Sequence, residues 1–344
     1  MVTGSDLPLT RRSMPCTIRT RWRFAALPKR AGPCAWVLML ALCQSAAARS
    51  GHPAPSMPIC TAPSITSQCC EITRSGFYQL DPGGSSDTLV SNGGDCVVVA
   101  VSNVTVNLNG ATIESSVGSG AGIHVMPKAA NVFIEGDQGT VKSFANGVEI
   151  DGMNDTVEFL TTKGNSVAGV FLNGARQAKV ADVISGDFGP NPSEANIYGI
   201  RVAGGSYNQI LNADCEGNAF YGIWLAATSY NSVIDFRVVN NAHAGLYVGC
   251  SNTGPQGMAC PRKATSNYNS IAGGVATDPG SDSQSYGVAI ELGSANNRVT
   301  GITATGNHVL DVFDENQQQT SGACGSNLWF AETIIGNDFP GCIH

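Results

Sequence analysis

One four-residue phrase recurs along the central part of the sequence and constrains the fold more than any other feature. It begins with glycine, its second and fourth residues are Ile, Val or Leu, and its third residue varies. The copies are Gly122–Val125, Gly147–Ile150, Gly169–Leu172, Gly199–Val202, Gly222–Leu225, Gly245–Val248, Gly287–Ile290 and, without the glycine, Val309–Val312. The intervals between their first positions are 25, 22, 30, 23, 23, 42 and 22 residues. A unit of this size is typical of a solenoid, here with two larger insertions.

Each unit contains three short segments with the period of a β-strand. Apolar residues alternate within the phrase, which predicts a strand with one buried face. A second segment begins with Asn or Tyr-Asn, as in Tyr207–Ile210, and a third follows it, as in Ala213–Cys215. A turn ending in Asn comes next, and we expect this Asn to take the left-handed backbone that a tight corner requires. Three strands per coil predict a three-sided prism of parallel sheets, with stacked Asn side chains bonded to their neighbours.

The composition agrees with an all-β solenoid. The 344 residues include 41 glycines, and only 13% are charged. Gly, Asn, Ser, Thr and Val dominate the body of the chain, which favours strands and tight turns. A solenoid grows by adding coils, so this length does not require two globular domains.

The first 48 residues differ from the rest and predict a secretory signal peptide, with Met1 or Met14 as its start. Seven basic residues and one acid precede an apolar run, Ala35–Leu42, and the small residues Ala46–Ala48. The run is too short for a membrane-spanning helix, so we expect cleavage after Ala48 and no membrane association afterwards. The net charge then changes from −7 to −13, which argues against nucleic-acid partners. The expected location is secreted, periplasmic or at the cell surface.

Nine cysteines remain after residue 48, and export makes disulfides the expected state of eight of them. Cys324 is expected to pair with Cys342, and Cys250 with Cys260. The remaining four form two bridges in one of three pairings: Cys60, Cys69, Cys70 and Cys96. Cys215 lies at an inward strand position, level with Ser185, Val238 and Ala276, and is predicted to be a buried free thiol. No Cys/His spacing matches a zinc site, and we predict no metal or cofactor.

The sequence divides into five parts. After the signal peptide, residues 49–58 are a Pro/Ser/Gly-rich flexible leader. Residues 59–100 form a disulfide-rich N-terminal cap, residues 101–318 a parallel β-helix, and residues 319–344 a C-terminal cap with the final coil. Caps are expected because an exposed end of a strand stack recruits other chains.

This arrangement resembles the right-handed parallel β-helix of the pectin-lyase-like superfamily over residues 95–337. The resemblance rests on the coil length and on the Gly-Ile-x-Val and Tyr-Asn-x-Ile phrases. Members include polysaccharide lyases, polygalacturonases, epimerases, phage tailspikes and noncatalytic surface proteins. The closing segment from Cys324 to Ile343 looks like the tail of secreted bacterial members. The resemblance therefore implies a polysaccharide partner and leaves the chemistry open. The sequence predicts no oligomeric state.

The third residue of each phrase is expected to point outward, about 4.8 Å from the same residue of the next coil. Read in order, this stripe is His124, Glu149, Phe171, Arg201, Trp224, Tyr247, Ala289 and Asp311. Exposed rings on a flat sheet mark a binding surface, so we predict substrate contacts for Phe171, Arg201, Trp224, Tyr247 and His124. The alternative is a ring stack that only stabilises the sheet. Three insertions, 186–197, 250–266 and 278–285, are expected to wall this face.

Two hypotheses about function stay open. If the chain is an enzyme, it is a polysaccharide lyase or glycoside hydrolase, with Arg201 and Glu149, roughly 9–10 Å apart, as catalytic candidates. The clustered motifs of polygalacturonases do not occur together on successive coils. The alternative is a noncatalytic cell-surface or structural protein. On a neighbouring sheet, Asp214 and Arg237 are predicted to form an exposed ion pair.

Overall fold

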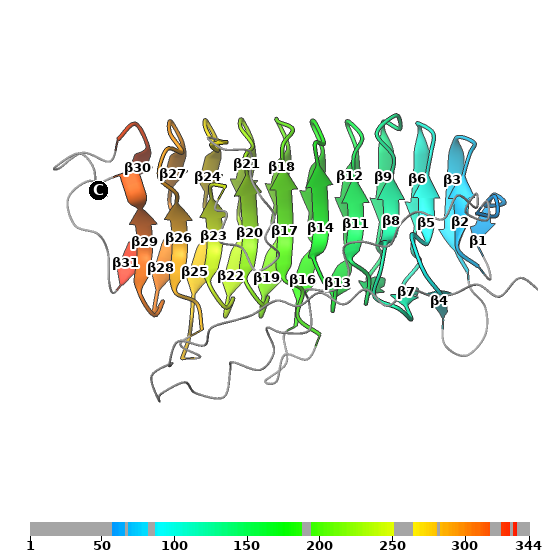
Figure 1. Cartoon of the computed structure of the whole chain (residues 1–344), viewed down its shortest axis with the longest axis horizontal. Coiled ribbons are helices and arrows are strands. Elements are labelled where there is room, and N and C mark those ends of the chain that lie inside the picture. The colour runs from blue at the N-terminus through cyan, green and yellow to red at the C-terminus, as the bar shows by residue number, and fades with distance from the viewer. Residues whose placement is uncertain are drawn as a thin grey trace, which may run out of the picture. The chain divides into compact units, whose positions relative to one another are not determined.

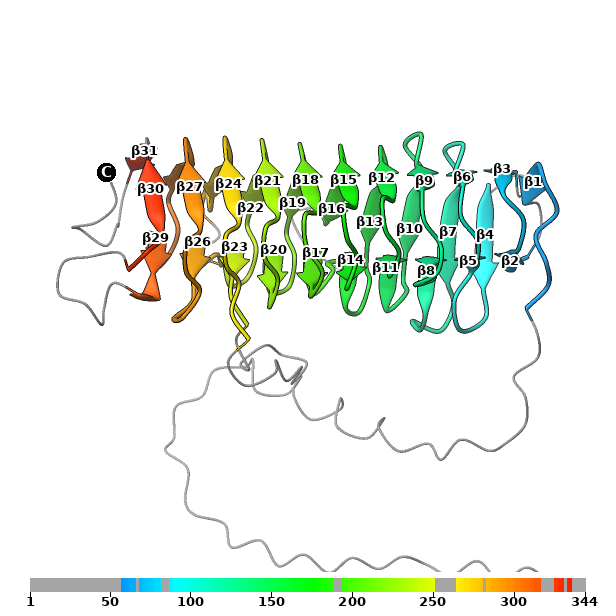
Figure 2. The same cartoon turned by 90° about the horizontal axis from the view of Figure 1, so that it is seen from above.

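The computed structural model describes residues 57–65, 68–81, 87–187, 194–250, 264–280, 283–316, 325–330 and 333–335. These residues form strands β1 to β31, and none of them forms an α-helix. No described segment is a helix of the length and apolar character needed to cross a bilayer. The strands lie in three parallel sheets and stack in chain order, as Figure 1 and Figure 2 show. The predicted all-β fold with three parallel sheets is confirmed.

The sheet that contains the glycine phrase, called sheet A, has ten strands. They are β2 (Cys70–Ile72), β5 (Val97–Val99), β8 (Ala121–Val125), β11 (Asn146–Ile150), β14 (Ala168–Asn173), β17 (Tyr198–Ala203), β20 (Tyr221–Ala226), β23 (Ala244–Val248), β26 (Tyr286–Ile290) and β29 (Leu310–Asp314).

Sheets B and C close the prism. Sheet B contains β1 (Ser64–Ile65), β3 (Gly76–Leu80), β6 (Val104–Asn107), β9 (Val132–Glu135), β12 (Thr156–Glu158), β15 (Lys179–Ala181), β18 (Gln209–Leu211), β21 (Ser232–Ile234), β24 (Ser270–Ala272), β27 (Arg298–Thr300) and β30 (Leu328–Phe330). Sheet C contains β4 (Thr88–Ser91), β7 (Thr112–Ser115), β10 (Thr140–Lys142), β13 (Thr161–Lys163), β16 (Ile184–Gly186), β19 (Asp214–Glu216), β22 (Arg237–Val239), β25 (Val275–Thr277), β28 (Thr303–Thr305) and β31 (Thr333–Ile335).

In five of the phrases, those of Gly147, Gly199, Gly222, Gly245 and Gly287, the glycine is explained by a polar ladder inside the prism. A Cβ added to Gly222 would lie 2.6 Å from the carbonyl oxygen of Gly245 and 2.9 Å from Nδ2 of Asn241. The missing side chain therefore makes room for a buried amide. The ladder runs through Asn165, Asn196, Asn218, Asn241, Gln284 and Asn307, and each amide donates to the oxygen of the next at 2.6–3.4 Å. The expected bonding between stacked Asn side chains is confirmed.

A second ladder lies at the corner between sheets A and B. Its members are Asn208, Asn231, Asn269, Asn297 and Asn327, whose amides donate to the next oxygen at 3.0–3.2 Å. Its last amide donates to Oδ2 of Asp314 at 3.0 Å. The Tyr-Asn phrase thus supplies the buried amide of three coils, and Asn297 and Asn327 continue the ladder.

The expected left-handed backbone at these Asn residues is wrong. In the turns before sheet A, the residue with positive φ is the one before the ladder Asn: Gly164, Gly217, Asn240 or Gly306. At the corner before sheet B it is the Tyr of the Tyr-Asn phrase, at φ 56–61° in Tyr207, Tyr230 and Tyr268. The ladder Asn needs an ordinary backbone because its side chain must point inward. The three tyrosine rings are exposed and stack on one another, with centroids 5.1–5.3 Å apart.

The last coil is shifted by two residues from the predicted register. Phe313, not Asp311, pairs with Ala289, so Phe313 ends the outward stripe. Asp311 is buried, and its Oδ1 accepts hydrogen bonds from the backbone N–H and Nδ2 of Asn307 at 3.0 and 2.7 Å. The carboxylate thus ends the first ladder at the place where earlier coils have glycine.

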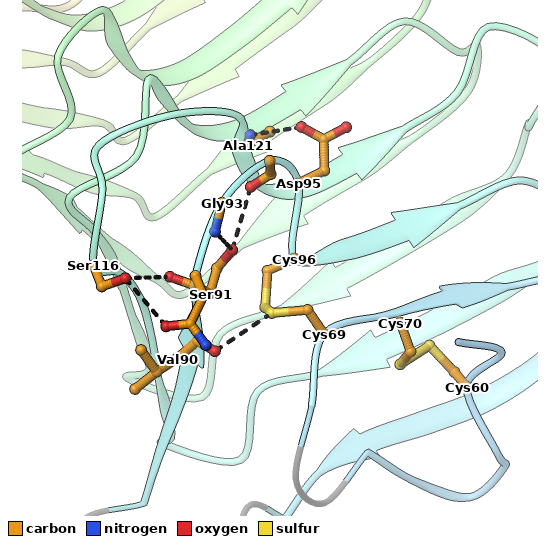
Figure 3. The surroundings of a disulfide bond; sticks show 12 residues. Cys60, Cys69, Cys70, Val90, Ser91, Gly93, Asp95, Cys96, Ser116 and Ala121 are labelled. Carbon is orange, nitrogen blue, oxygen red and sulfur yellow. Dashed lines mark hydrogen bonds between the residues drawn. A yellow bond between two sulfur atoms is a disulfide. The ribbon is translucent and has the colours of Figure 1, made fainter. Parts of the chain in front are cut away.

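The N-terminal coils contain two disulfides, Cys60–Cys70 and Cys69–Cys96 (Figure 3). Cys250 is also disulfide-bonded, whereas Cys260, Cys324 and Cys342 lie outside the described residues. The predicted signal peptide and most of the leader lie outside them as well. Cys215 is a buried free thiol in register with Ser185 and Val238, which confirms that prediction.

Candidate functional site

The outer face of sheet A carries the predicted stripe. His124, Glu149, Phe171, Arg201, Trp224, Tyr247 and Ala289 pair in this order along the sheet. Side chains 22–30 residues apart in most of these steps therefore become lateral neighbours, as the repeat predicts. The rings of this stripe belong to a hydrophobic cluster separate from the core inside the prism. The face has a polar part at its N-terminal end and an aromatic part in its middle.

The polar part is a group of titratable side chains that we call the polar centre: Asp95, His124, Glu149 and Asp151. His124 Nδ1 lies 2.7 Å from Asp95 Oδ2, and His124 Nε2 lies 3.2 Å from Asp151 Oδ2. Glu149 accepts hydrogen bonds from Asn146 Nδ2 at 2.8 Å and from Asn173 Nδ2 at 3.3 Å. Adjacent strands β8 and β11 place His124 and Glu149 side by side.

Asp95 is positioned by the first coils. It precedes Cys96, which is bonded to Cys69, and its Oδ1 accepts a hydrogen bond from the backbone N–H of Ala121 at 2.8 Å (Figure 3). The hydrogen bond to Asp95 raises the pKa of His124 to about 9, and a second one to Asp151 adds to this, against the opposing effect of burial. Burial alone would raise the pKa of Asp95, but the hydrogen bonds from His124 and Ala121 outweigh it, so that pKa is lowered.

The aromatic part has Arg201 between two rings. Its Cζ lies 4.7 Å from the ring centroid of Phe171 and 4.7 Å from that of Trp224, the arrangement of a double cation–π contact. Tyr221 and Tyr247 stack with centroids 4.7 Å apart and an interplanar angle of 8°. Burial raises the pKa of Tyr198, beside Arg201, to about 12.

Besides Asp311, the predicted exposure of the stripe is wrong at three positions, Arg201, Trp224 and Ala289, which are all buried. Trp224 is only 1% exposed and Arg201 8%, whereas His124, Phe171 and Tyr247 are partly exposed. The Trp224 indole N–H donates to the carbonyl of Gly249 at 2.9 Å, which satisfies its one donor within the protein. Trp224 and Arg201 therefore support the face, and its accessible surface is formed by His124, Glu149, Phe171 and Tyr247.

Some residues of this face were not identified from the sequence. Tyr198, Tyr221 and Tyr286 occupy the position before the glycine of the phrase, and they join the aromatic cluster. A Tyr-Gly pair in three coils was the available signal. Asp151 directly follows a phrase and lies two residues after Glu149, so strand alternation also places it on the outward side. Asp95 gives no repeat signal, because it belongs to an N-terminal coil without the phrase.

The two catalytic candidates lie on β11 and β17, with Phe171 of β14 between them. Burial lowers the pKa of Arg201, while Glu149 and Tyr198 oppose this change. The predicted loop walls lie mostly outside the described residues. On sheet C the predicted ion pair is confirmed, since Arg237 Nη1 lies 2.8 Å from Asp214 and 2.6 Å from Glu216.

Comparisons with known proteins place the fold. No family model matches the sequence, and no curated protein matches it. Among solved structures, the Dettilon tailspike protein is similar with a TM-score of 0.50 and 15% identity, over 80% of this chain and 53% of the tailspike. The periplasmic alginate epimerase AlgG has a TM-score of 0.45 and 11% identity, over 75% of this chain and 73% of the epimerase. Pectate lyase Pel9A has a TM-score of 0.39 and 16% identity, over 76% of this chain and 69% of the lyase.

The chain thus spans about half of the length of the tailspike. Identities at this level concern the backbone and not the side chains that carry a function. The three parallel sheets, the coil period and the tailspike likeness agree with one another. This protein has the fold of a right-handed parallel β-helix.

Proposed function

We propose that this chain binds a polysaccharide along the outer face of sheet A, with the sugar chain running across the strands. The observation that carries the proposal is the line of partly exposed Tyr247, Phe171, Glu149 and His124, which all belong to one register row. Neighbouring members of that row lie about 4.8 Å apart on a rigid sheet. An extended polymer fits such a row better than a compact ligand does.

The chemistry of the row suits sugars. The faces of sugar rings carry C–H groups that pack on aromatic side chains, and their hydroxyl groups bond to carboxylates and amides. Glu149, Asp151 and Asn173 offer such groups beside Phe171. Alginate and pectate appear in the names of two of the β-helix proteins above, but the proposal rests on the side chains of this face.

We further propose that the protein acts outside the cytoplasm, as a secreted, periplasmic or cell-surface protein. The Cys60–Cys70 and Cys69–Cys96 disulfides support this, because such bonds persist in oxidising compartments. The basic and apolar N-terminal segment agrees with export.

Cleavage of the bound polymer is the second candidate function, by a lyase or glycoside-hydrolase reaction. The observation that favours it is the polar centre, where Glu149, Asp151 and His124 bring proton-transfer groups within 4.8 Å of one another. Glu149 remains the catalytic candidate. For Arg201, burial between Phe171 and Trp224 favours holding these rings in place over contact with the reacting atoms.

A glycan array followed by binding titrations tests the first proposal. Phe171→Ala and Tyr247→Ala should each weaken binding at least about tenfold, because a lost sugar–ring contact is worth about 1.4 kcal/mol or more. Phe77→Ala on sheet B, which also removes an exposed ring, is the matched control and should bind as the wild type does. Wild-type affinity in both face variants would move the binding site elsewhere.

Product assays on the best ligand then test cleavage. New reducing ends indicate either reaction, and an unsaturated product indicates a lyase. Glu149→Gln should abolish product formation and retain binding if Glu149 transfers a proton. Binding with no product from the wild type would leave the noncatalytic alternative.

A further inference from the structure

The polar centre has the arrangement of a metal-ligand histidine with its supporting carboxylate. His124 Nδ1 lies 2.7 Å from Asp95, while Nε2 faces Asp151 on the other side of the ring. Metal-binding histidines donate the N–H of one ring nitrogen to a carboxylate or carbonyl and bind the ion through the other nitrogen. Asp95 therefore sets the ring orientation that leaves Nε2 directed at Asp151.

Two further oxygen ligands lie beside Nε2. Donor atoms of His124, Glu149 and Asp151 all lie within 4.8 Å of one another. Two atoms at 2.0–2.2 Å from the same ion can be up to about 4.4 Å apart, so a side-chain adjustment of a few tenths of an ångström brings all three onto one ion. The ligands come from adjacent strands, β8 and β11, and from the residue that follows β11. Such a scaffold holds them in place before an ion binds.

Two buried oxygens lack hydrogen-bond partners, one on the ligand Asp151 and one on Asn146, whose amide is bonded to the ligand Glu149. Asp151 Oδ1 and Asn146 Oδ1 are both buried without one, and Asn146 is 9% exposed in total. The amide of Asn146 donates to Glu149 Oε2 at 2.8 Å, so this side chain belongs to the centre. A buried oxygen without a partner costs roughly 1–3 kcal/mol, and for Asp151 Oδ1 an ion that accepts its lone pair removes that cost.

We propose that the polar centre binds a divalent transition-metal ion, Zn²⁺ or Mn²⁺, through His124 Nε2, Glu149 and Asp151. An imidazole nitrogen with two carboxylates suits these ions, whereas Ca²⁺ requires six to eight oxygen ligands. Three carboxylates face one imidazole here, so a divalent cation also balances the local charge. The sequence predicts no metal site because the three ligands lie on two coils and match no Cys/His spacing of a zinc site. This proposal stands independently of the polysaccharide.

The test uses the full chain after chelator treatment and dialysis. Zn²⁺ and Mn²⁺ are titrated by calorimetry, with Ca²⁺ as a comparison, and Co²⁺ binding is followed by visible absorption. We expect one equivalent of Zn²⁺ or Mn²⁺ to bind, and a Co²⁺ spectrum typical of mixed nitrogen and oxygen ligands. Asp151→Asn and Glu149→Gln should each weaken binding at least about tenfold, and Asp95→Asn should weaken it by about 10–100-fold through the ring it holds.

Asp214→Asn is the matched control, because it removes one carboxylate charge from the pair with Arg237 on sheet C. Its affinity for the ion should equal that of the wild type, and circular dichroism should show that all variants are folded. Absence of saturable binding, or equal weakening in Asp214→Asn and Asp151→Asn, would overturn the proposal and leave His124 as a bridge between two carboxylates. Glycan binding measured on the same variants separates this outcome from a failure of the polysaccharide proposal.

Discussion

Asp155 provides a direct test of how the ladder at the corner before sheet B stabilises the fold. Thr156, Lys179 and Gln209 pair in register at the starts of β12, β15 and β18. The residues before them, Asp155, Ala178 and Asn208, are therefore level, and Asp155 occupies the position of a ladder amide. Its Oδ1 accepts the backbone N–H of Val132 at 2.8 Å, just as Asn231 Oδ1 accepts that of Asn208 at 3.0 Å. Its Oδ2 is buried without a hydrogen-bond partner.

We predict that Asp155→Asn stabilises the protein at neutral pH. Asn208 at the equivalent place donates to the carbonyl of Ala175 at 3.0 Å, three residues before Ala178. The corresponding carbonyl for Asp155 is that of Ala129. Both this oxygen and Asp155 Oδ2 lie near the Cβ position of Gly152. The Nδ2 of an asparagine at residue 155 can therefore donate to the Ala129 carbonyl, at the place where the carboxylate puts its second oxygen.

The magnitude follows from the pKa of Asp155, which burial raises from 3.8 to about 6. At about 1.4 kcal/mol per pKa unit, ionising this group in the folded state costs about 3 kcal/mol. Because the folded pKa is raised, the wild type has its full stability below pH 4 and loses this amount as pH rises through about 6. The variant has no such loss, so its advantage should be about 3 kcal/mol at pH 7 and about 1 kcal/mol or less at pH 4.

Urea unfolding followed by circular dichroism at both pH values measures this difference. Comparing variant with wild type at each pH cancels the titration of the other carboxyl groups. Asp137→Asn, which changes an exposed aspartate, should shift neither transition by more than about 0.5 kcal/mol. An equal advantage at the two pH values, or a less stable Asn variant at pH 7, would refute the argument.

Two further predictions concern the ladders. Gly222→Ala should destabilise the protein by about 3 kcal/mol or more, because the new Cβ would lie 2.6 Å from the Gly245 carbonyl oxygen; the urea midpoint measures the loss, and an unchanged midpoint would contradict the packing. Asn231→Ala removes the acceptor of two Asn208 N–H groups and should cost about 3 kcal/mol, whereas the exposed Asn92→Ala should cost about 0.5 kcal/mol or less. Equal midpoints for these two Asn variants would exclude the ladder as a source of stability.

The sequence predicts the architecture because the repeat reports directly on stacking. A residue type that recurs every 22–23 positions meets its own copies in space, so Ile200, Ile223 and Leu246 identify the buried row without any knowledge of the rest. The shift in the last coil was not predicted, because Val309–Val312 also alternates apolar residues. The decisive signal was the need of Asn307 for an acceptor, which Asp311 meets.

For the candidate site, the sequence predicts which residues share the outward row, but not which of them are exposed. The outward order from His124 to Tyr247 follows from the register. Exposure does not, because it depends on neighbours in other rows, such as Tyr198 and Tyr221 beside Trp224. The polar centre combines residues from three coils, of which only His124 and Glu149 share a position of the repeat, so no single spacing in the sequence reveals it.

The two aspartates near the C-terminal end have a consequence for the number of coils. Along each ladder, every amide gives its hydrogen to the following coil, so the ladder has a direction, and a further amide would again need a neighbour. Asp311 and Asp314 accept hydrogen bonds and return none, which lets the series stop without an orphaned donor. A version with a further coil would therefore need an acceptor of this kind at the new end of each ladder.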